Sequence, residues 1–303
     1  CIKAASLLNA DKDKVAQWNH VLKHLWTRSF LQVGTDGEVI SPAEEYYTDK
    51  RYTPWNWASG GSIAFPAGLI GIDDRNSRLG KAVADFLKYN KIMNAHYPLS
   101  EIAARMGLGD EALKYLIEGV NIHQMYPQGL MHNVTGYPDN IYNLSSIHDL
   151  LDHRFTIRSQ AFFQCGMEPI SNYATAINEM MLQSNENKIR VFSAIPTAWD
   201  GCRIAFTLLA RGAFIVSSER DELAQVNQVG IKSLQGNFCR IQNPWSEKEK
   251  IVIVEEASRK KVNFKVEAGN VINFATKPGI EYVIRLSDGK VQDKQVYSGT
   301  RNN

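Results

Sequence analysis

The spacing of hydrophobic residues along the chain changes near residue 187. Before this point, apolar residues recur at intervals of three and four, which is typical of amphipathic helices. The helical stripes are Val15, Trp18, Leu22, Leu25; Val83, Phe86, Leu87; Ile102, Met106; Leu113, Leu116, Ile117, Val120; and Ile170, Tyr173, Ala174, Ile177, Met181. The pattern predicts about five or six helices in residues 1–186, joined by long loops.

From residue 187 onward, large hydrophobic residues alternate with other residues, as in Ile204, Phe206 and Leu208. Turn pairs such as Asp200-Gly201 and Pro278-Gly279 recur between these runs. Many short strands with regular turns favour an antiparallel β-sandwich. The predicted fold class is therefore multidomain α + β, with a helical domain over residues 1–186 and a β-sandwich domain over residues 187–303.

Composition excludes several classes of protein. The chain has 303 residues, of which 22% are charged, and its formal net charge is +2. This composition is typical of globular proteins and gives no indication of a nucleic-acid partner. No apolar run reaches the ~18 residues that a membrane span needs.

Common cofactor and nucleophile motifs are missing from the sequence. The four cysteines, Cys1, Cys165, Cys202 and Cys239, have no C-x-x-C spacing, so we expect free thiols and no metal. The sequence also lacks G-x-S-x-G, a P-loop and a dinucleotide fingerprint. We therefore expect chemistry that needs no cofactor.

Glu168 and Pro169 stand directly before the last helical stripe. Proline suits the first position of a helix, which would place Glu168 at the cap, facing the positive end of the helix dipole. That environment favours an ionised carboxylate, which can act as a base or nucleophile. The alternative is that Glu168 only caps the helix.

Two further segments carry candidate site residues. Trp55, Asn56 and Trp57 lie in a loop rich in Pro and Gly, where indole rings could stack on a sugar or anchor the loop in the core. Glu44 and Glu45 stand beside two tyrosines and are either functional carboxylates or part of a solvated acidic loop.

Three segments of the sequence resemble glycoside hydrolase family 95, the α-L-fucosidase family of six-hairpin glycosidases. The first runs from Ala174 through Asn178-Glu179-Met180-Met181-Leu182-Gln183-Ser184 to Trp199. The others are Leu209-Ala210-Arg211-Gly212-Ala213-Phe214 and Ala103-Ala104-Arg105-Met106-Gly107. The resemblance is strong over residues 172–214 and thin elsewhere.

The resemblance implies an (α/α)6 toroid followed by a β domain, and an inverting hydrolysis in which one carboxyl acts as acid and another activates water. Glu168 aligns with the aspartate of the family's Asp-x-Asn-Phe-Gly turn, which makes it the expected base. The turn departs from the family pattern, because it reads Ile170-Ser171-Asn172 after the proline. We expect Trp55, Asn56, Trp57, His96, Glu44, Glu45 and Asn172 to bind the carbohydrate substrate, with Glu44 or Glu45 as a substitute acid.

The resemblance also implies a longer protein. The family's general acid lies upstream of the part that matches residue 1, and the chain has about half the helices of a toroid. We therefore expect the C-terminal half of a toroid, with a missing N-terminal region as a partner. By analogy, such enzymes are secreted or periplasmic.

Two other functions stay open. The protein could be a carbohydrate-binding relative, or a truncated fragment, that lacks the general acid. It could also be a polysaccharide lyase on a helical toroid, with Tyr46, Tyr47 and Arg51 supplying the base and the neutralising charge.

Overall fold

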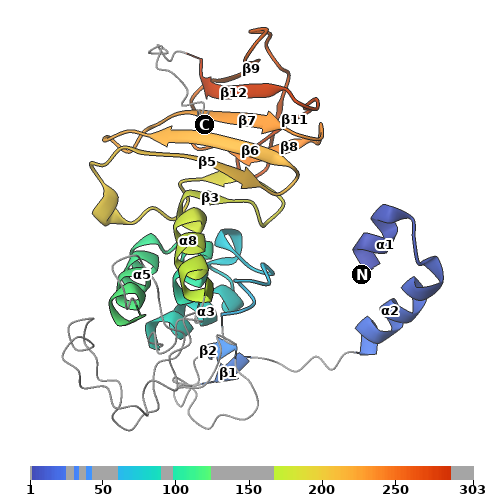
Figure 1. Ribbon diagram of the computed structural model, residues 1–303, viewed down its shortest axis with the longest axis vertical. Coiled ribbons are helices and arrows are strands. Elements are labelled where there is room, and N and C mark those ends of the chain that lie inside the picture. Colours follow the sequence, from blue (N-terminus) through green and yellow to red (C-terminus); the bar gives the residue numbers. More distant parts are fainter. Residues whose placement is uncertain are drawn as a thin grey trace.

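A computed structural model of the chain describes residues 2–24, 31–33, 39–42, 61–89, 98–123 and 167–287 (Figure 1). Helices occupy most of the described first part and antiparallel strands the second, so the predicted α + β class is confirmed. Within these ranges, no helix has the length and apolar character that a bilayer crossing requires.

The described helices differ widely in length. They are α1 (Ile2–Leu8), α2 (Lys12–His24), η1 (Ile72–Asp74), α3 (Arg78–Tyr89), α4 (Leu99–Arg105), α5 (Gly109–His123), α8 (Met167–Met181) and η2 (Thr197–Trp199). A short antiparallel hairpin, β1 (Leu31–Val33) with β2 (Val39–Pro42), also lies in the part expected to be helical.

The remaining strands come after α8 in the sequence, and the first of them begins directly at its end. They are β3 (Leu182–Gln183), β4 (Arg190–Val191), β5 (Ile204–Ala210), β6 (Phe214–Arg220), β7 (Val226–Ser233), β8 (Cys239–Gln242), β9 (Ile251–Glu255), β10 (Lys265–Glu267), β11 (Val271–Phe274) and β12 (Glu281–Leu286).

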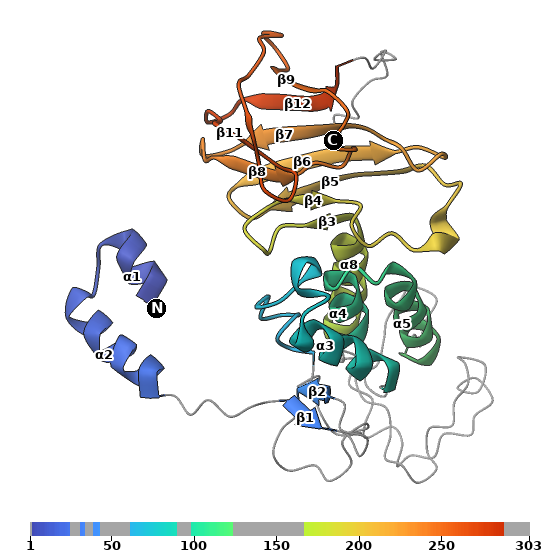
Figure 2. The same ribbon diagram turned by 180° about the vertical axis from the view of Figure 1, so that it is seen from behind.

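Helix α4 lies at the centre of the helical part, and all seven of its residues are buried. It packs against α5 and α8, which lie beside it in Figure 2. Arg105, at the end of α4, contacts Glu179, near the end of α8, and Glu101, earlier in α4, lies near Tyr173, earlier in α8, so the two helices run in the same direction. The helix ends at Arg105, and Gly107, two residues later, adopts a left-handed φ of 72° that favours glycine.

The sequence stripes agree with the buried faces only in part. The predicted positions Val83, Phe86 and Leu87 in α3 and Ile102 and Met106 around α4 are all buried. In contrast, α2 buries no residue among those described, although its stripe predicts an apolar face.

Helices α5 and α8 bury only part of the stripes that the sequence predicts. Ile117 is 47% exposed and Ile177 is 36% exposed. In α8, Tyr173 is buried as predicted, and the other buried positions are Ala176 and Met180; in α5 the buried positions are Ala112, Tyr115 and Gly119.

Close approach explains this choice of face. A Cβ atom on Gly119 would lie 2.1 Å from the Tyr173 hydroxyl, so only glycine leaves room for this ring between the helices. The contact therefore depends on the shapes of the two residues, which the spacing of hydrophobic positions in the sequence does not reveal.

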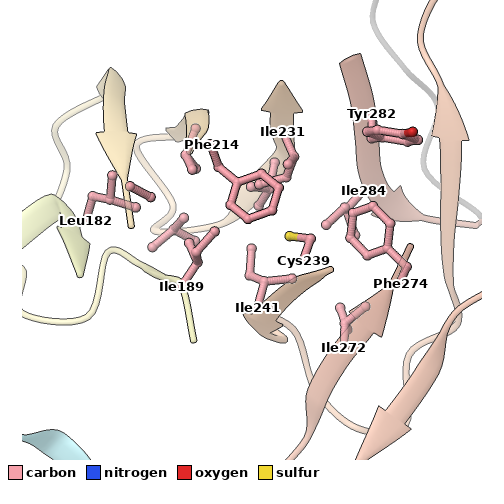
Figure 3. Packing of buried hydrophobic residues seen from close by; sticks show 14 of the residues in the cluster. Leu182, Ile189, Phe214, Ile231, Cys239, Ile241, Ile272, Phe274, Tyr282 and Ile284 are labelled. Atoms are coloured by element: carbon pink, nitrogen blue, oxygen red, sulfur yellow. The ribbon is translucent and has the colours of Figure 1, made fainter. Parts of the chain in front are cut away.

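After α8, the short antiparallel pair β3-β4 is followed by two larger antiparallel sheets with a common core. A five-stranded sheet has the order β5-β6-β7-β12-β9, and a three-stranded sheet has the order β10-β11-β8. Side chains from both sheets form one buried cluster, including Phe214, Ile231 and Ile241 (Figure 3). The rings of Phe274 and Tyr282, one from each sheet, meet edge to face with centroids 5.5 Å apart. Alternate residues of β6 are buried, as the period-two pattern predicts.

Candidate functional site

Most of the predicted site residues lie outside the described part of the chain. This holds for Glu44, Glu45, Trp55, Asn56, Trp57 and His96, and also for Tyr46, Tyr47 and Arg51, the residues considered for a lyase. Their roles stay predictions from the sequence.

The backbone of Glu168 lies in the first turn of α8. The helix begins at Met167, two residues before the predicted start at Pro169. The side chain of Glu168 lies outside what the structure describes, so its role as a base stays a prediction from the sequence. Asn172 follows one turn later and is half-buried.

The sequence segments that carry the family resemblance contact one another at the other end of α8. Arg105 donates two hydrogen bonds to Glu179, from Nε to Oε2 at 2.8 Å and from Nη2 to Oε1 at 2.6 Å. The side chains of Arg105 and Glu179 are only 5% and 16% exposed. This bidentate geometry is the strongest form of an arginine–carboxylate pair, and it fixes α4 against α8.

Hydrogen bonds extend the same junction into the β part. The Gln183 amide donates to the Ala104 carbonyl at 2.6 Å and to the Glu179 carbonyl at 3.0 Å. The Ser184 hydroxyl accepts a hydrogen bond from the Arg211 backbone N–H at 3.0 Å. These motif residues therefore hold the helices and the sheets together, and the described contacts give them a structural role.

Sequence analysis did not single out Glu101, which is a buried carboxyl in α4. It is 1% exposed, and its Oε1 atom has no hydrogen-bond partner among the described residues. Burial, and to a smaller extent the charge of Glu179, raise the pKa of Glu101 to about 8. Burial, with a contribution from Glu101, also raises the pKa of the neighbouring Tyr173 hydroxyl. The sequence does contain a signal for Glu101, because an acidic residue stands there among apolar and small residues.

No set of three or more metal-ligating side chains comes together within the ranges that the structure describes. Cys202 is an exposed free thiol and Cys239 a buried one. Burial raises the pKa of the Cys239 thiol, which makes it unreactive.

The chain has low similarity to several solved structures of glycoside hydrolases. An α-L-rhamnosidase from Dictyoglumus thermophilum is 10% identical with a TM-score of 0.37, and the match covers 94% of this chain and 30% of that one. A GH127 β-L-arabinofuranosidase from Geobacillus stearothermophilus T6 is 13% identical with a TM-score of 0.24, covering 94% and 40%. The catalytic domain of GH30 xylanase C from Talaromyces cellulolyticus is 7% identical with a TM-score of 0.22, covering 35% and 27%.

The chain spans less than half the length of each of these proteins. No curated protein matches the chain. One family model does match: "Glycoside hydrolase family 95, C-terminal domain", over residues 183–284. The match begins at Gln183, inside the junction described above, and ends in β12. The resemblance predicted from the sequence is therefore confirmed: residues 183–284 match the model of the glycoside hydrolase family 95 C-terminal domain.

Proposed function

We propose that this protein is a glycoside hydrolase whose active site lies at the N-terminal ends of α4 and α8. The family match over residues 183–284 is the observation that carries this proposal. In finer detail, we propose an inverting exo-glycosidase that removes terminal α-L-fucose or a related sugar, and that is secreted or periplasmic like similar enzymes.

The helix arrangement supports this location. Helices α4 and α8 run parallel, so their N-terminal ends lie on the same side, and Glu168 is in the first turn of α8. His96 precedes α4 by three residues in the sequence. We therefore propose that His96 and Glu168 approach the same saccharide.

The proposal includes the domain arrangement. We propose that residues 1–186 are part of an (α/α)6 toroid and that the two sheets in residues 187–303 form a β-sandwich. Buried α4 and its parallel neighbour α8 would be inner helices of the toroid, with α5 between them on the outside. An N-terminal region with further helices would complete the ring.

In this mechanism Glu168 is the base that removes a proton from the attacking water. The first turn of a helix stabilises the ionised carboxylate that a base requires. An acid must protonate the leaving oxygen from the opposite face, with the two carboxyl groups ~6.5–9.5 Å apart for inversion. Glu44 or Glu45 would supply this acid, unless it comes from the proposed N-terminal region.

The test is Glu168→Gln, made in the chain and in a form that includes the proposed upstream region, and assayed on aryl α-L-fucosides. We expect kcat to fall by about 100-fold or more, because general base catalysis contributes ~10²–10⁴. Glu111→Gln on the exposed surface of α5 is the matched control and should leave kcat unchanged. Undiminished turnover by Glu168→Gln would remove this residue from the mechanism.

A carbohydrate-binding relative without catalysis is the second candidate. The longer Glu168 stands where the family has aspartate, and Ile170-Ser171-Asn172 stands where it has Asn-Phe-Gly. Glycan binding without hydrolysis by the longer form would establish this function instead.

A further inference from the structure

Helix α8 contacts α4 in two different ways along its length (Figure 2). At its C-terminal end, the Arg105–Glu179 pair and the hydrogen bonds that Gln183 donates attach it to α4. Six residues before Glu179, the Tyr173 ring packs beside Gly119 of α5, and its hydroxyl is close enough to Glu101 for the charge of that carboxyl to act on it. Polar contacts therefore hold one end of α8, whereas a buried ring and a buried carboxyl meet nearer its start.

The Glu101 carboxyl has no cation partner among the described side chains. It is 1% exposed, and its Oε1 atom accepts no hydrogen bond from that part of the chain. Of the described side chains on α3, α4, α5 and α8, Arg105 is the only buried cation, and its Nε and Nη2 atoms already bind Glu179. The other cations on these helices are all exposed; they are Arg78, Lys81, Lys88 and Lys114. A buried carboxyl in this situation is more stable as the neutral acid.

The other titratable groups that face α4 do not favour a charge on Glu101 either. The described acidic side chains on the helices packed against α4 are Tyr173 and Glu179 in α8, Asp110, Glu111, Tyr115 and Glu118 in α5, and Asp85 in α3. Burial, and to a smaller extent the charge of Glu179, raise the pKa of Glu101 to about 8. Ionisation of Glu101 would thus add a second negative charge to an interface that already holds the Glu179 carboxylate.

We propose that Glu101 makes the contact between α4 and α8 a pH-sensitive hinge. While the carboxyl is protonated, the first half of α8 packs on α4 and α5. When the carboxyl ionises, the charge must reach water, so the first half of α8 separates from α4 while the Arg105–Glu179 end stays attached. Helix α8 is the element that moves, because α4 is buried along its whole length.

The hinge has a consequence for the proposed active site. The backbone of Glu168 lies in the first turn of α8, five residues before Tyr173, so the opening would displace the proposed base. This consequence rests on the proposed function. The opening itself does not, because it depends only on the packing of α4, α5 and α8.

Amide hydrogen exchange of the complete chain between pH 5 and pH 7 tests the hinge without any substrate. An opening that releases one proton becomes about tenfold more frequent for each pH unit in this range. After correction for intrinsic exchange rates, the opening equilibrium at Tyr173 and Ala176 should therefore rise about 100-fold from pH 5 to pH 7. The amides of Val229 and Ile231 in β7 are the internal reference, and they should exchange more slowly at every pH.

Glu101→Gln keeps the shape of the neutral acid, so the opening of α8 in this variant should not depend on pH. Glu111→Gln, exposed on α5, is the matched control and should behave as the wild type does. If Glu101→Gln fails to fold, carbon NMR of the wild-type glutamate carboxyls decides, because the hinge requires Glu101 to titrate well above the exposed glutamates. A pH-independent opening in the wild type, a pH dependence that persists in Glu101→Gln, equal exchange at α8 and β7, or an ordinary titration of Glu101 would each overturn the proposal.

Discussion

Replacing Glu101 by Gln should remove a pH-dependent penalty on the folding of this protein. The carboxyl is 1% exposed, and its pKa is about 8 instead of the ordinary 4.5. The folded state therefore holds a proton between these pH values that the unfolded state releases. The contribution of the protonated Glu101 carboxyl to the free energy of unfolding is fully present below pH 4.5. It is lost progressively as the pH rises to about 8.

The size of the effect follows from the same values. At ~1.4 kcal/mol for each unit of pKa, the penalty at pH 7 is about 3 kcal/mol, and it approaches 5 kcal/mol above pH 8. A neutral glutamine has the shape of the protonated acid and no charge to bury. The free energy of unfolding of Glu101→Gln should therefore equal that of the wild type near pH 4.5 and exceed it by several kcal/mol at pH 8.

The assay is urea unfolding followed by circular dichroism, at a series of pH values from 4.5 to 9, with Glu111→Gln as an exposed control. The difference in unfolding free energy between Glu101→Gln and the wild type should grow with pH, while the control should run parallel to the wild type. Parallel curves for Glu101→Gln would mean that the carboxyl is ionised in the folded protein, which would refute the reasoning.

Two further predictions concern the junction and the thiols. Arg105→Ala leaves the largely buried Glu179 carboxylate without its bidentate partner, so the free energy of unfolding should fall by about 3 kcal/mol. A double-mutant cycle with Glu179→Ala measures the coupling between the two side chains. Additive losses of stability in the double variant would show that the pair does not interact. In the native protein, a chromogenic thiol reagent should modify exposed Cys202 quickly and buried Cys239 only after denaturation; equal rates for both would contradict the burial of Cys239.

The sequence by itself determined the two structural classes and the family resemblance. Period-three-and-four spacing locates α3, α4, α5 and α8, and period-two spacing indicates strands such as β5, because one buried face imposes its own repeat on each kind of element. The motif around Glu179–Ser184 resembles glycoside hydrolase family 95, and the model of that family's C-terminal domain matches residues 183–284.

Only the tertiary structure decided which helix faces are buried and what the motif residues do. The Tyr173 ring of α8 packs against Gly119 of α5, and this contact leaves the more hydrophobic Ile117 exposed. Arg105 and Glu179 lie 74 residues apart in the chain, so their pairing could not be derived from local spacing. The protonated state of Glu101 is likewise a product of packing, because the cost of burying a charge depends on neighbours from other helices.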